Sequence, residues 1–294
     1  MDWIVVVSAD ERVEGKLAPA TEAAALAALD HHGCILLRGA FAPATIEAMH
    51  GEYVSQLGTM DLAAMAAATL KPAPNRHIMV GPGRYDTTLR MTGAFGRMDV
   101  FANDVLLRFL RPLLGKDMRL NSFTAVASYP GAAGQQPHRD HDHLYPQPGV
   151  GPGLPIYAVN VAVPLIDVDL TTGPTGVWLG SHRSGRLVAV QGKDMAAQPL
   201  QRGDCMLLDY RTLHTGLPNR SDQVRPIVYM VYGRRWFFDD VNYVKRIPLD
   251  MPLERYHELP ESVRPLLVRA FSYAMLTRWR EAELPGAAAM IPNA

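Results

Sequence analysis

Apolar positions in the first part of the chain form two short runs and two helical patterns. Residues 4–7 predict a short strand, and the alanine-rich residues 19–30 predict a helix. Gly33 directly follows this helix and is suited to end it, because glycine tolerates the left-handed backbone of a helix terminus. Residues 34–37 predict a second strand, and residues 43–53 carry apolar side chains at helical spacing.

The pattern changes at residue 121. From there, apolar runs alternate with turns rich in glycine, proline and aspartate, which is typical of a β-sandwich or β-barrel. The runs occupy residues 121–129, 156–163, 186–190, 204–208 and 225–232. Helical spacing returns on both sides of this region, at residues 103–114 and 261–280. The sequence therefore predicts a β core with helices packed before and after it.

Composition and charge narrow the classes of partner. The chain has 294 residues, 29 basic and 29 acidic, and a formal net charge of zero. This balance argues against a nucleic acid or membrane surface held by bulk electrostatics. The N-terminus lacks the pattern of a signal peptide, and no apolar stretch is long enough to span a bilayer. We expect a cytoplasmic monomer or homodimer, with Cys34 and Cys205 as buried thiols.

The candidate chemistry begins at residues 135–143, which hold three histidines and two aspartates. His138 and Asp140 stand two apart, so in an extended chain they share one face. They supply two of the three ligands in the 2-His-1-carboxylate triad of non-haem Fe(II) oxygenases. Asp142 shares this parity and is a rival carboxylate, whereas His141 points to the other face. The alternative is a solvated loop rich in histidine and aspartate.

A third ligand has to come from downstream, and His214 is the candidate. It follows a turn and a strand, and ten residues separate it from Arg225. Arg225 begins an apolar strand, where its planar guanidinium could hold the far carboxylate of a dicarboxylate through two parallel hydrogen bonds. Arg220, in the turn at residues 218–222, competes for this role.

Four motifs now stand in order along the chain. They are Gln135-x-x-His138-x-Asp140, the loop from Thr172 to His182 with its Gly-Ser-His end, Gly203-Asp204, and His214-x10-Arg225. This order resembles the phytanoyl-CoA dioxygenase family of Fe(II)/2-oxoglutarate oxygenases. Leu179 departs from the family pattern, because proline is usual at that position. The resemblance covers the layout of residues 30–240 and is sharpest at 121–235.

The resemblance implies a fold of the α+β class with a β core. That core is a double-stranded β-helix, the cupin-like jelly roll, with flanking N- and C-terminal helices. We expect a single domain over residues 1–294. It divides into a mixed N-terminal part at 1–118, the jelly-roll core at about 119–247, and a C-terminal helical segment at 248–294.

The resemblance also implies a reaction. The cofactors would be Fe(II), 2-oxoglutarate as co-substrate, and O₂. The enzyme would oxidise an unactivated C–H bond of a small molecule, in the first instance by hydroxylation, and release succinate and CO₂. Residues 159–167 and Trp236 look most similar to bacterial members that oxidise secondary metabolites. A metal-dependent hydrolase with the same ligands and a non-catalytic jelly-roll binding protein are the alternatives.

The roles of individual residues follow from the same resemblance. The iron ligands would be His138, Asp140 and His214. Arg225 would pair with the C5 carboxylate of 2-oxoglutarate. Gln135 and Thr175 match positions that line the co-substrate site, with hydrogen bonding in a turn as the alternative for both.

The entrance for the substrate is the last expectation. Residues 76–97 are irregular around a Gly-Pro-Gly break, and we predict a poorly ordered lid there, with an ordinary surface loop as the alternative. The tentative substrate contacts are Arg84 and Arg90 on this lid and His143, Tyr145 and Trp236 on the barrel side.

Overall fold

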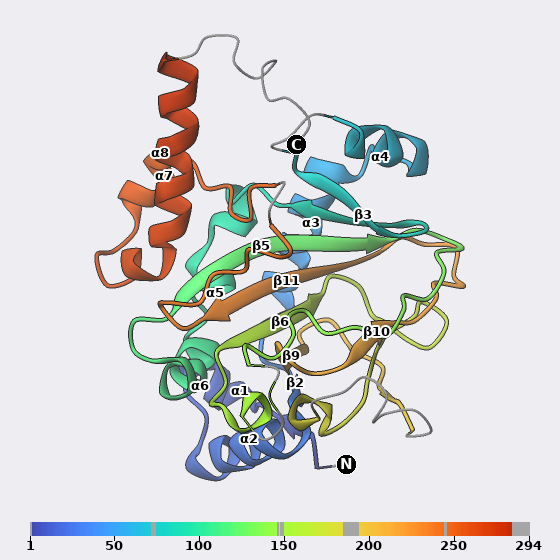
Figure 1. Cartoon of the computed structure of the whole chain (residues 1–294), viewed down its shortest axis with the longest axis vertical. Helices are drawn as coiled ribbons and strands as arrows, with labels where there is room; N and C mark the ends of the chain where they lie inside the picture. The colour runs from blue at the N-terminus through green and yellow to red at the C-terminus, as the bar shows by residue number, and fades with distance from the viewer. Residues whose placement is uncertain are drawn as a thin grey trace.

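A large sheet of eight strands runs through the centre of the protein (Figure 1). The computed structural model describes residues 2–71, 75–145, 147, 150–184, 194–243 and 246–283. The strand order is β1-β2-β9-β6-β11-β5-β4-β3, and among these described strands only β1 and β2 pair in parallel. The strands are β1 (Ile4–Val6), β2 (Cys34–Arg38), β3 (His77–Gly81), β4 (Arg84–Thr88), β5 (Arg119–Ser128), β6 (Ala158–Pro164), β9 (Cys205–Asp209) and β11 (Arg225–Gly233).

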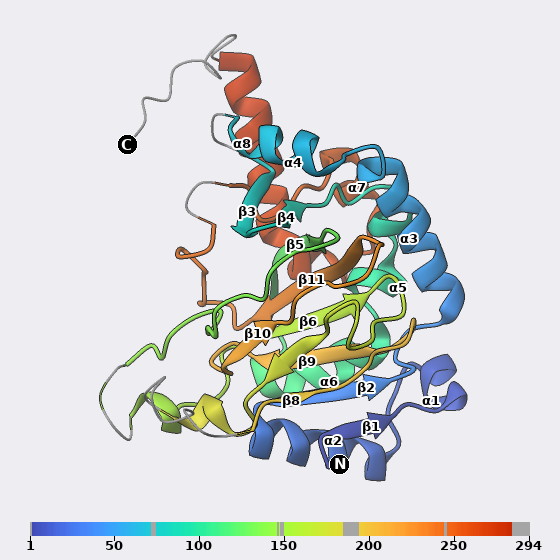
Figure 2. The same cartoon turned by 90° about the vertical axis from the view of Figure 1, so that its right-hand side faces the viewer.

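A second sheet of three strands lies over one face of the large one (Figure 2). Its order is β10-β7-β8, formed by β10 (His214–Gly216), β7 (Thr175–Val177) and β8 (Ala196–Ala197). Two facing sheets, antiparallel except for the β1–β2 pair, form the jelly roll that the resemblance implied. The strand expected at 186–190 lies outside the described residues.

Helices cover the opposite face and the ends of the large sheet. Figure 2 shows α3 and α5 on the side of the large sheet away from β10, and α6 packs against β11. The helices are α1 (Ala9–Glu14), α2 (Pro19–His32), α3 (Pro43–Leu57), α4 (Leu62–Thr69), α5 (Met98–Phe101), α6 (Asp104–Leu114), α7 (Leu253–Glu258) and α8 (Val268–Glu283). The fold is thus α+β, as expected. No helix in the described ranges is long and apolar enough to cross a membrane.

Alternation along the strands separates the core from the site. On β5, Phe123 and Ala125 are buried and pair with Met230 and Val228 of β11, in the main hydrophobic cluster. The next positions of β5, Thr124 and Val126, line a cavity instead. Successive side chains of a strand point to opposite faces, so one face of the sheet packs on helices and the other forms a cavity wall.

The strands at 121–129, 156–163, 204–208 and 225–232 are confirmed as β5, β6, β9 and β11. The prediction that residues 76–97 are irregular is wrong, although part of this segment does line the cavity, at Ile78, Val80, Gly81 and Pro82. Residues 77–88 form the hairpin of β3 and β4, and β4 pairs with β5 from Arg84–Ser128 to Thr88–Thr124. The segment belongs to the sheet because its backbone hydrogen bonds are met by β5. The Gly-Pro-Gly break is only the turn of this hairpin.

Candidate metal centre and adjoining cavity

Three side chains from distant parts of the chain meet at one point. His138 and His214 form an isolated antiparallel bridge, in which each backbone N–H donates to the other residue's carbonyl at 2.9 Å. Asp140 follows two residues later, and its Oδ1 lies 3.5 Å from Nε2 of His214. One ligand atom from each of the three residues lies within 4.8 Å of the others. The structure therefore brings together the three residues predicted as ligands.

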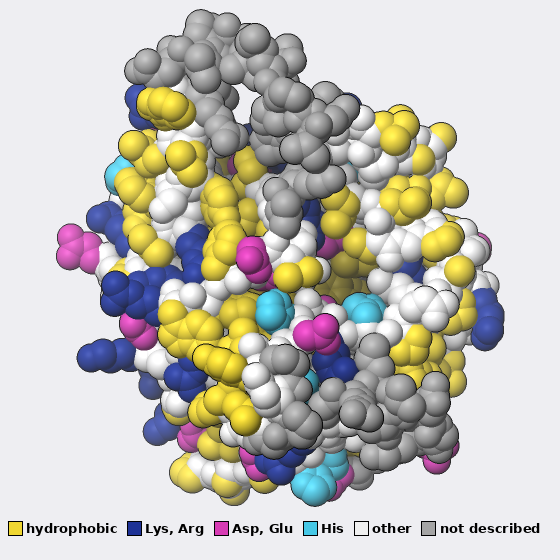
Figure 3. All heavy atoms as spheres, in the orientation of Figure 1, with side chains coloured by type: hydrophobic (Ala, Val, Ile, Leu, Met, Phe, Trp, Pro, Cys, Tyr) yellow, Lys and Arg dark blue, Asp and Glu magenta, His cyan; other side chains and the backbone are white. Residues whose placement is uncertain are grey.

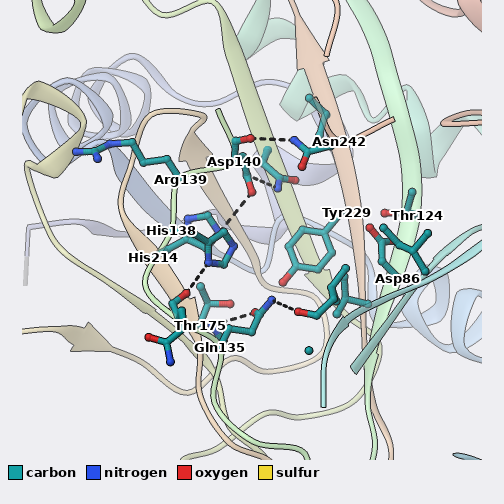
Figure 4. A pocket seen from close by; sticks show the side chains of 18 of the residues that line it. Asp86, Thr124, Gln135, His138, Arg139, Asp140, Thr175, His214, Tyr229 and Asn242 are labelled. Carbon is teal, nitrogen blue, oxygen red and sulfur yellow. Dashed lines mark hydrogen bonds and ion pairs between the residues drawn. The ribbon is translucent and has the colours of Figure 1, made fainter. Parts of the chain in front are cut away.

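Hydrogen bonds set the orientation of each of these side chains, and Figure 4 shows those made by Asp140. Nδ1 of His138 lies 2.9 Å from the carbonyl oxygen of Gln136, and Nδ1 of His214 lies 3.0 Å from that of Thr212. With its proton on Nδ1, each ring donates to a carbonyl and leaves Nε2 to bind a metal. The amide of Asn160 donates to Oδ2 of Asp140 at 2.9 Å, which leaves Oδ1 on the side of the histidines.

Burial keeps the first imidazole in the form that a metal needs. Desolvation lowers the pKa of His138, and the neighbouring His214 lowers it further against the opposing effect of Asp140. A neutral imidazole is the form that coordinates a cation. The site therefore offers a neutral nitrogen donor at His138, next to the imidazole of His214 and the carboxylate of Asp140.

The neighbouring candidates lie elsewhere. The ring of His141 packs at 5.4 Å from the ring of Phe237 and at 6.0 Å from that of Tyr157. Nε2 of His143 lies 3.2 Å from the carbonyl oxygen of Ser184. Asp142 is exposed. The structure groups Asp140, rather than Asp142, with the two histidines.

A cavity of about 670 Å³ opens beside the triad, between the two sheets. In Figure 3 the centre of this face is hollowed, with histidine, acidic and basic side chains around the hollow. Arg225, Gln135 and Thr175 line the cavity, as expected. Arg220 does not, and it is exposed in its turn. Among the described residues, the polar side chains of the lining are Asp86, Thr124, Gln135, Gln136, His138, Arg139, Asp140, Asn160, Thr175, Tyr210, His214, Arg225, Tyr229, Asn242, Tyr243 and Arg246.

Arg225 lies in a row with a second buried arginine. Ser128 of β5 pairs with Arg225 of β11 on one side and with Arg84 of β4 on the other. Residues directly opposite on neighbouring strands project from the same face, so both arginines point to the cavity side of the sheet. Arg84 is 0% exposed and Arg225 is 1% exposed.

The two guanidinium groups have neutral partners only. Arg225 donates to the carbonyl of Gly173 and, at 2.7 Å, to Oγ of Ser128, and its Nε has no partner. Arg84 donates to Ala133 and Leu217 carbonyls, and its Nη1 has no partner. In the described ranges, no carboxylate lies within ion-pair distance of either.

The pKa values of Arg84 and Arg225 reflect their burial without an acidic partner among the described residues. Burial lowers the pKa of Arg84 to about 10, and the positive charge of Arg225 contributes. Burial also lowers the pKa of Arg225. Arg225 in the cavity wall and Arg84 behind it form a site for an anion, because an anion offsets the cost of burying both charges.

The five tentative substrate contacts do not line the cavity. Arg84 is buried behind it, beside Arg225, and not at an entrance. Arg90 is exposed, and its backbone bonds to the side chain of Gln56. Tyr145 and Trp236 are 53% and 62% exposed. The alternation of Arg84 and Asp86 with Tyr85 was the sequence signal for a strand that placed Arg84 inside.

Sequence comparison identifies the family of this site. The profile of the phytanoyl-CoA dioxygenase (PhyH) family matches residues 29–227, about two thirds of the chain, including all three residues of the triad. The chain belongs to the phytanoyl-CoA dioxygenase family. The match reaches from α2 to β11 and includes Arg225, so the resemblance noted from four motifs is confirmed.

Curated relatives carry dioxygenase names. The dioxygenase aneA of Aspergillus aculeatus is 28% identical over 204 residues, which cover 66% of this chain and 62% of the relative. The dioxygenase lolE1 of Epichloe uncinata is 27% identical over 146 residues, or 46% of this chain and 53% of the relative. The chain thus spans between about half and three fifths of the length of these relatives.

Solved structures share the fold. The non-heme alpha-ketoglutarate-dependent epimerase SnoN from nogalamycin biosynthesis superposes with a TM-score of 0.59 at 16% identity, covering 79% of this chain and 91% of SnoN. HygX from Streptomyces hygroscopicus, with nickel, 2-oxoglutarate and hygromycin B bound, gives 0.55 at 16% identity, covering 80% and 97%. These likenesses confirm the predicted jelly-roll architecture.

Proposed function

We propose that this protein is an Fe(II)- and 2-oxoglutarate-dependent dioxygenase that oxidises a C–H bond of a small molecule. Iron would be held by His138, Asp140 and His214. The arrangement fits Fe(II), because two imidazoles and one carboxylate on one side of a metal leave the other positions open. Bound iron with 2-oxoglutarate supplies O₂ activation, and the co-substrate leaves as succinate and CO₂.

The observation that carries the proposal is Arg225, a buried arginine that lines the cavity of the triad, with Arg84 buried behind it. A carboxylate at the position of Arg225 would accept two parallel charge-assisted hydrogen bonds. Arg84 would add a second positive charge behind it. Gln135 and Thr175, which line the same cavity, would contribute neutral hydrogen bonds along the co-substrate. A dicarboxylate that chelates iron through its other end satisfies both the arginines and the triad.

Hydroxylation is the reaction we propose for this site. The middle ligand is a carboxylate, Asp140, where a small residue would leave room for a halide, so the set favours oxygen transfer over halogenation. Two proteins of the same fold support a substrate from secondary metabolism. SnoN belongs to nogalamycin biosynthesis, and HygX was solved with hygromycin B bound.

We also propose that one domain carries this function. Strands β1 to β4, from the part before residue 119, continue the sheet that β5, β6, β9 and β11 form. The site draws on both parts, because Arg84 lies on β4 and Arg225 on β11.

The test is succinate formation with Fe(II), 2-oxoglutarate and O₂, together with the affinity for 2-oxoglutarate under anaerobic conditions. Arg225→Met should weaken 2-oxoglutarate binding by about 2–5 kcal/mol, because a buried ion pair is lost. Arg84→Met should weaken 2-oxoglutarate binding less, since Arg84 lies behind Arg225 and does not line the cavity. Arg220→Met is the matched control and should bind normally.

Two outcomes would contradict this proposal. Turnover of a substrate with Zn(II) and without 2-oxoglutarate would indicate a hydrolase. Tight ligand binding without any metal-dependent succinate formation would indicate a binding protein with a vestigial site.

A further inference from the structure

An ion pair between Asp86 of β4 and Arg246 lies in the wall of the same cavity. Nη2 of Arg246 donates to Oδ2 of Asp86 at 2.5 Å. Both residues line the cavity, and their side chains are 3% and 11% exposed. Asp86 stands two positions after Arg84 on β4, on the same face, so the pair lies one step along the strand from the two arginines.

The pair is incompletely satisfied. Oδ1 of Asp86 and both Nε and Nη1 of Arg246 are buried and have no hydrogen-bond partner in the described ranges. The guanidinium rests on the ring of Tyr243, 4.4 Å from its centroid, and that ring also lines the cavity. Buried polar atoms without partners are costly, and at a cavity wall they mark the place where a ligand completes the set.

The chemistry of that ligand follows from the charges. Asp86 neutralises Arg246, so the pair has no net charge. A carboxylate ligand would be repelled by the free Oδ1 of Asp86. An ammonium ligand would be repelled by the free N–H groups of Arg246. A neutral group that both donates and accepts matches the free atoms, because it can donate to Oδ1 while accepting from Nε or Nη1.

We propose that Asp86 and Arg246 form the subsite that recognises a hydroxyl-bearing end of the primary substrate, with vicinal hydroxyls as the best match. This inference rests on the proposed function, since it assigns part of the same cavity to the substrate. In Figure 4, Asp86 and Thr124 lie on the far side of Tyr229 from His138 and His214. A substrate anchored at Asp86 would extend past Tyr229 toward the triad.

The rest of the wall is consistent with a substrate that is apolar away from this end. Apolar side chains of β3, β5 and β11 line the cavity around the pair, namely Ile78, Val80, Val126 and Val231. They offer no hydrogen bonds and favour a carbon skeleton by the hydrophobic effect. The predicted substrate is a compact hydrocarbon framework with hydroxyl groups at one end.

Four probes on one ring separate the possibilities: cyclohexane-1,2-diol, cyclohexanol, cyclohexanecarboxylate and cyclohexylammonium. Their binding is measured by ligand-observed NMR at millimolar concentration, with and without Zn(II) and 2-oxoglutarate. Two hydrogen bonds to buried partners should make the diol bind about tenfold more tightly than the other three. In the Mn(II) form its resonances should broaden, because the pair and the triad line one cavity.

The double variant Asp86→Leu/Arg246→Met removes both charges together, which buried ion pairs tolerate better than the loss of one partner. The preference for the diol should fall to about twofold or less, since the polar anchors are gone. Asp209→Leu/Arg211→Met is the matched control. That pair is equally buried, with a 2.6 Å contact, but it lines a different cavity. The control should keep the diol preference.

The inference is overturned if a charged probe or cyclohexanol binds best, if no probe binds, or if the double variant keeps the preference while remaining folded. The wild-type selectivity decides the matter even where a variant does not fold. Metal and 2-oxoglutarate affinities, measured in parallel, keep the two proposals apart. Their loss would end the dioxygenase proposal, whereas their presence without diol selectivity would end only the substrate assignment.

Discussion

At the scale of single residues, the triad is held by its surroundings as much as by its own spacing. Each histidine is anchored through Nδ1 to a backbone carbonyl two residues before it, at Gln136 and at Thr212. The two backbones are also joined to each other by the bridge between residues 138 and 214. Partners of this kind orient ligands before a metal arrives, which reduces the cost of binding it.

The first prediction compares two histidines three positions apart. His138→Ala should remove most Fe(II) binding and turnover, because one of three ligands is lost. His141→Ala should leave metal affinity nearly unchanged, since its ring packs on Phe237 and Tyr157 instead. Isothermal titration with Fe(II) under anaerobic conditions measures both. The reverse pattern would show that the ligand register is different.

The second prediction concerns the amide that holds the carboxylate. Asn160→Ala removes the donor to Oδ2 of Asp140, which should lower metal affinity by about tenfold, in the range known for such supporting residues. Asn242 makes a useful comparison because its amide donates to the backbone oxygen of Asp140. Asn242→Ala should have a smaller effect on the same titration. If the two variants lost equal metal affinity, Asn160 would support the loop around Asp140 as a whole and not its carboxylate in particular.

Spacing along the sequence predicted the triad and Arg225. His138 and Asp140 lie two apart on one short stretch, and His214 and Arg225 are separated by the interval typical of the family. It did not predict the place of Arg84. Its burial depends on β4 pairing with β5, so that Arg84, Ser128 and Arg225 form one row. Such a row joins residues 44 and 97 positions apart, and no local pattern contains that information.

At the scale of elements, helix α1 shows how a short helix is stabilised at its start. Ser8 and Glu11 form a capping box, and the carboxylate of Glu11 also accepts from the backbone of Ala18 at 2.7 Å. Burial raises the pKa of Glu11, but the hydrogen bonds from Thr21, Ser8 and Ala18 together outweigh it and lower the pKa to about 2. The charged form is therefore the one that stabilises the fold.

A pH-dependent prediction follows for this helix. The folded pKa is below the ordinary value, so the stabilisation is complete above about pH 4.5 and is lost as the pH falls toward 2. Glu11→Gln should cost about 1 kcal/mol at neutral pH, and this difference should shrink on acidification. Urea denaturation at several pH values measures it. Glu14→Gln, at an exposed position of the same helix, is the control and should show no such trend.

Strands with a continuous apolar run were predictable, including the short β1 and β2, whereas the hairpin of β3 and β4 was not. β5, β6, β9 and β11 carry runs of apolar residues that are buried on the sheet. The hairpin of β3 and β4 mixes charged and apolar residues, because one face of it lines a polar cavity. Its sequence therefore resembles a loop, and only pairing with β5 makes it a strand.

At the scale of the whole molecule, the turn that ends helix α2 is hydrogen-bonded to the segment that holds the metal ligand His214. Gly33 ends α2 with a positive φ of 74°, and its carbonyl accepts from Oγ1 of Thr212 at 2.7 Å. Thr212 in turn supplies the carbonyl that holds Nδ1 of His214. The end of α2, the strand β2 that follows it and the ligand strand β10 are thus fixed relative to one another.

The last prediction uses two glycines with the same backbone but different surroundings. Gly33→Ala and Gly131→Ala both place a side chain at positive φ, of 74° and 79°, and each should cost about 1–2 kcal/mol for that reason. A Cβ at Gly33 would lie 2.3 Å from Nδ1 of His182 and 2.6 Å from Oγ1 of Thr212, whereas in the described part of the chain nothing lies within 4 Å of one at Gly131. Gly33→Ala should therefore lower the melting temperature further and also weaken metal binding, because Thr212 must move. Gly131→Ala should keep normal metal affinity, and equal effects of the two variants in thermal melts and metal titrations would show that the α2 turn does not position the ligand strand.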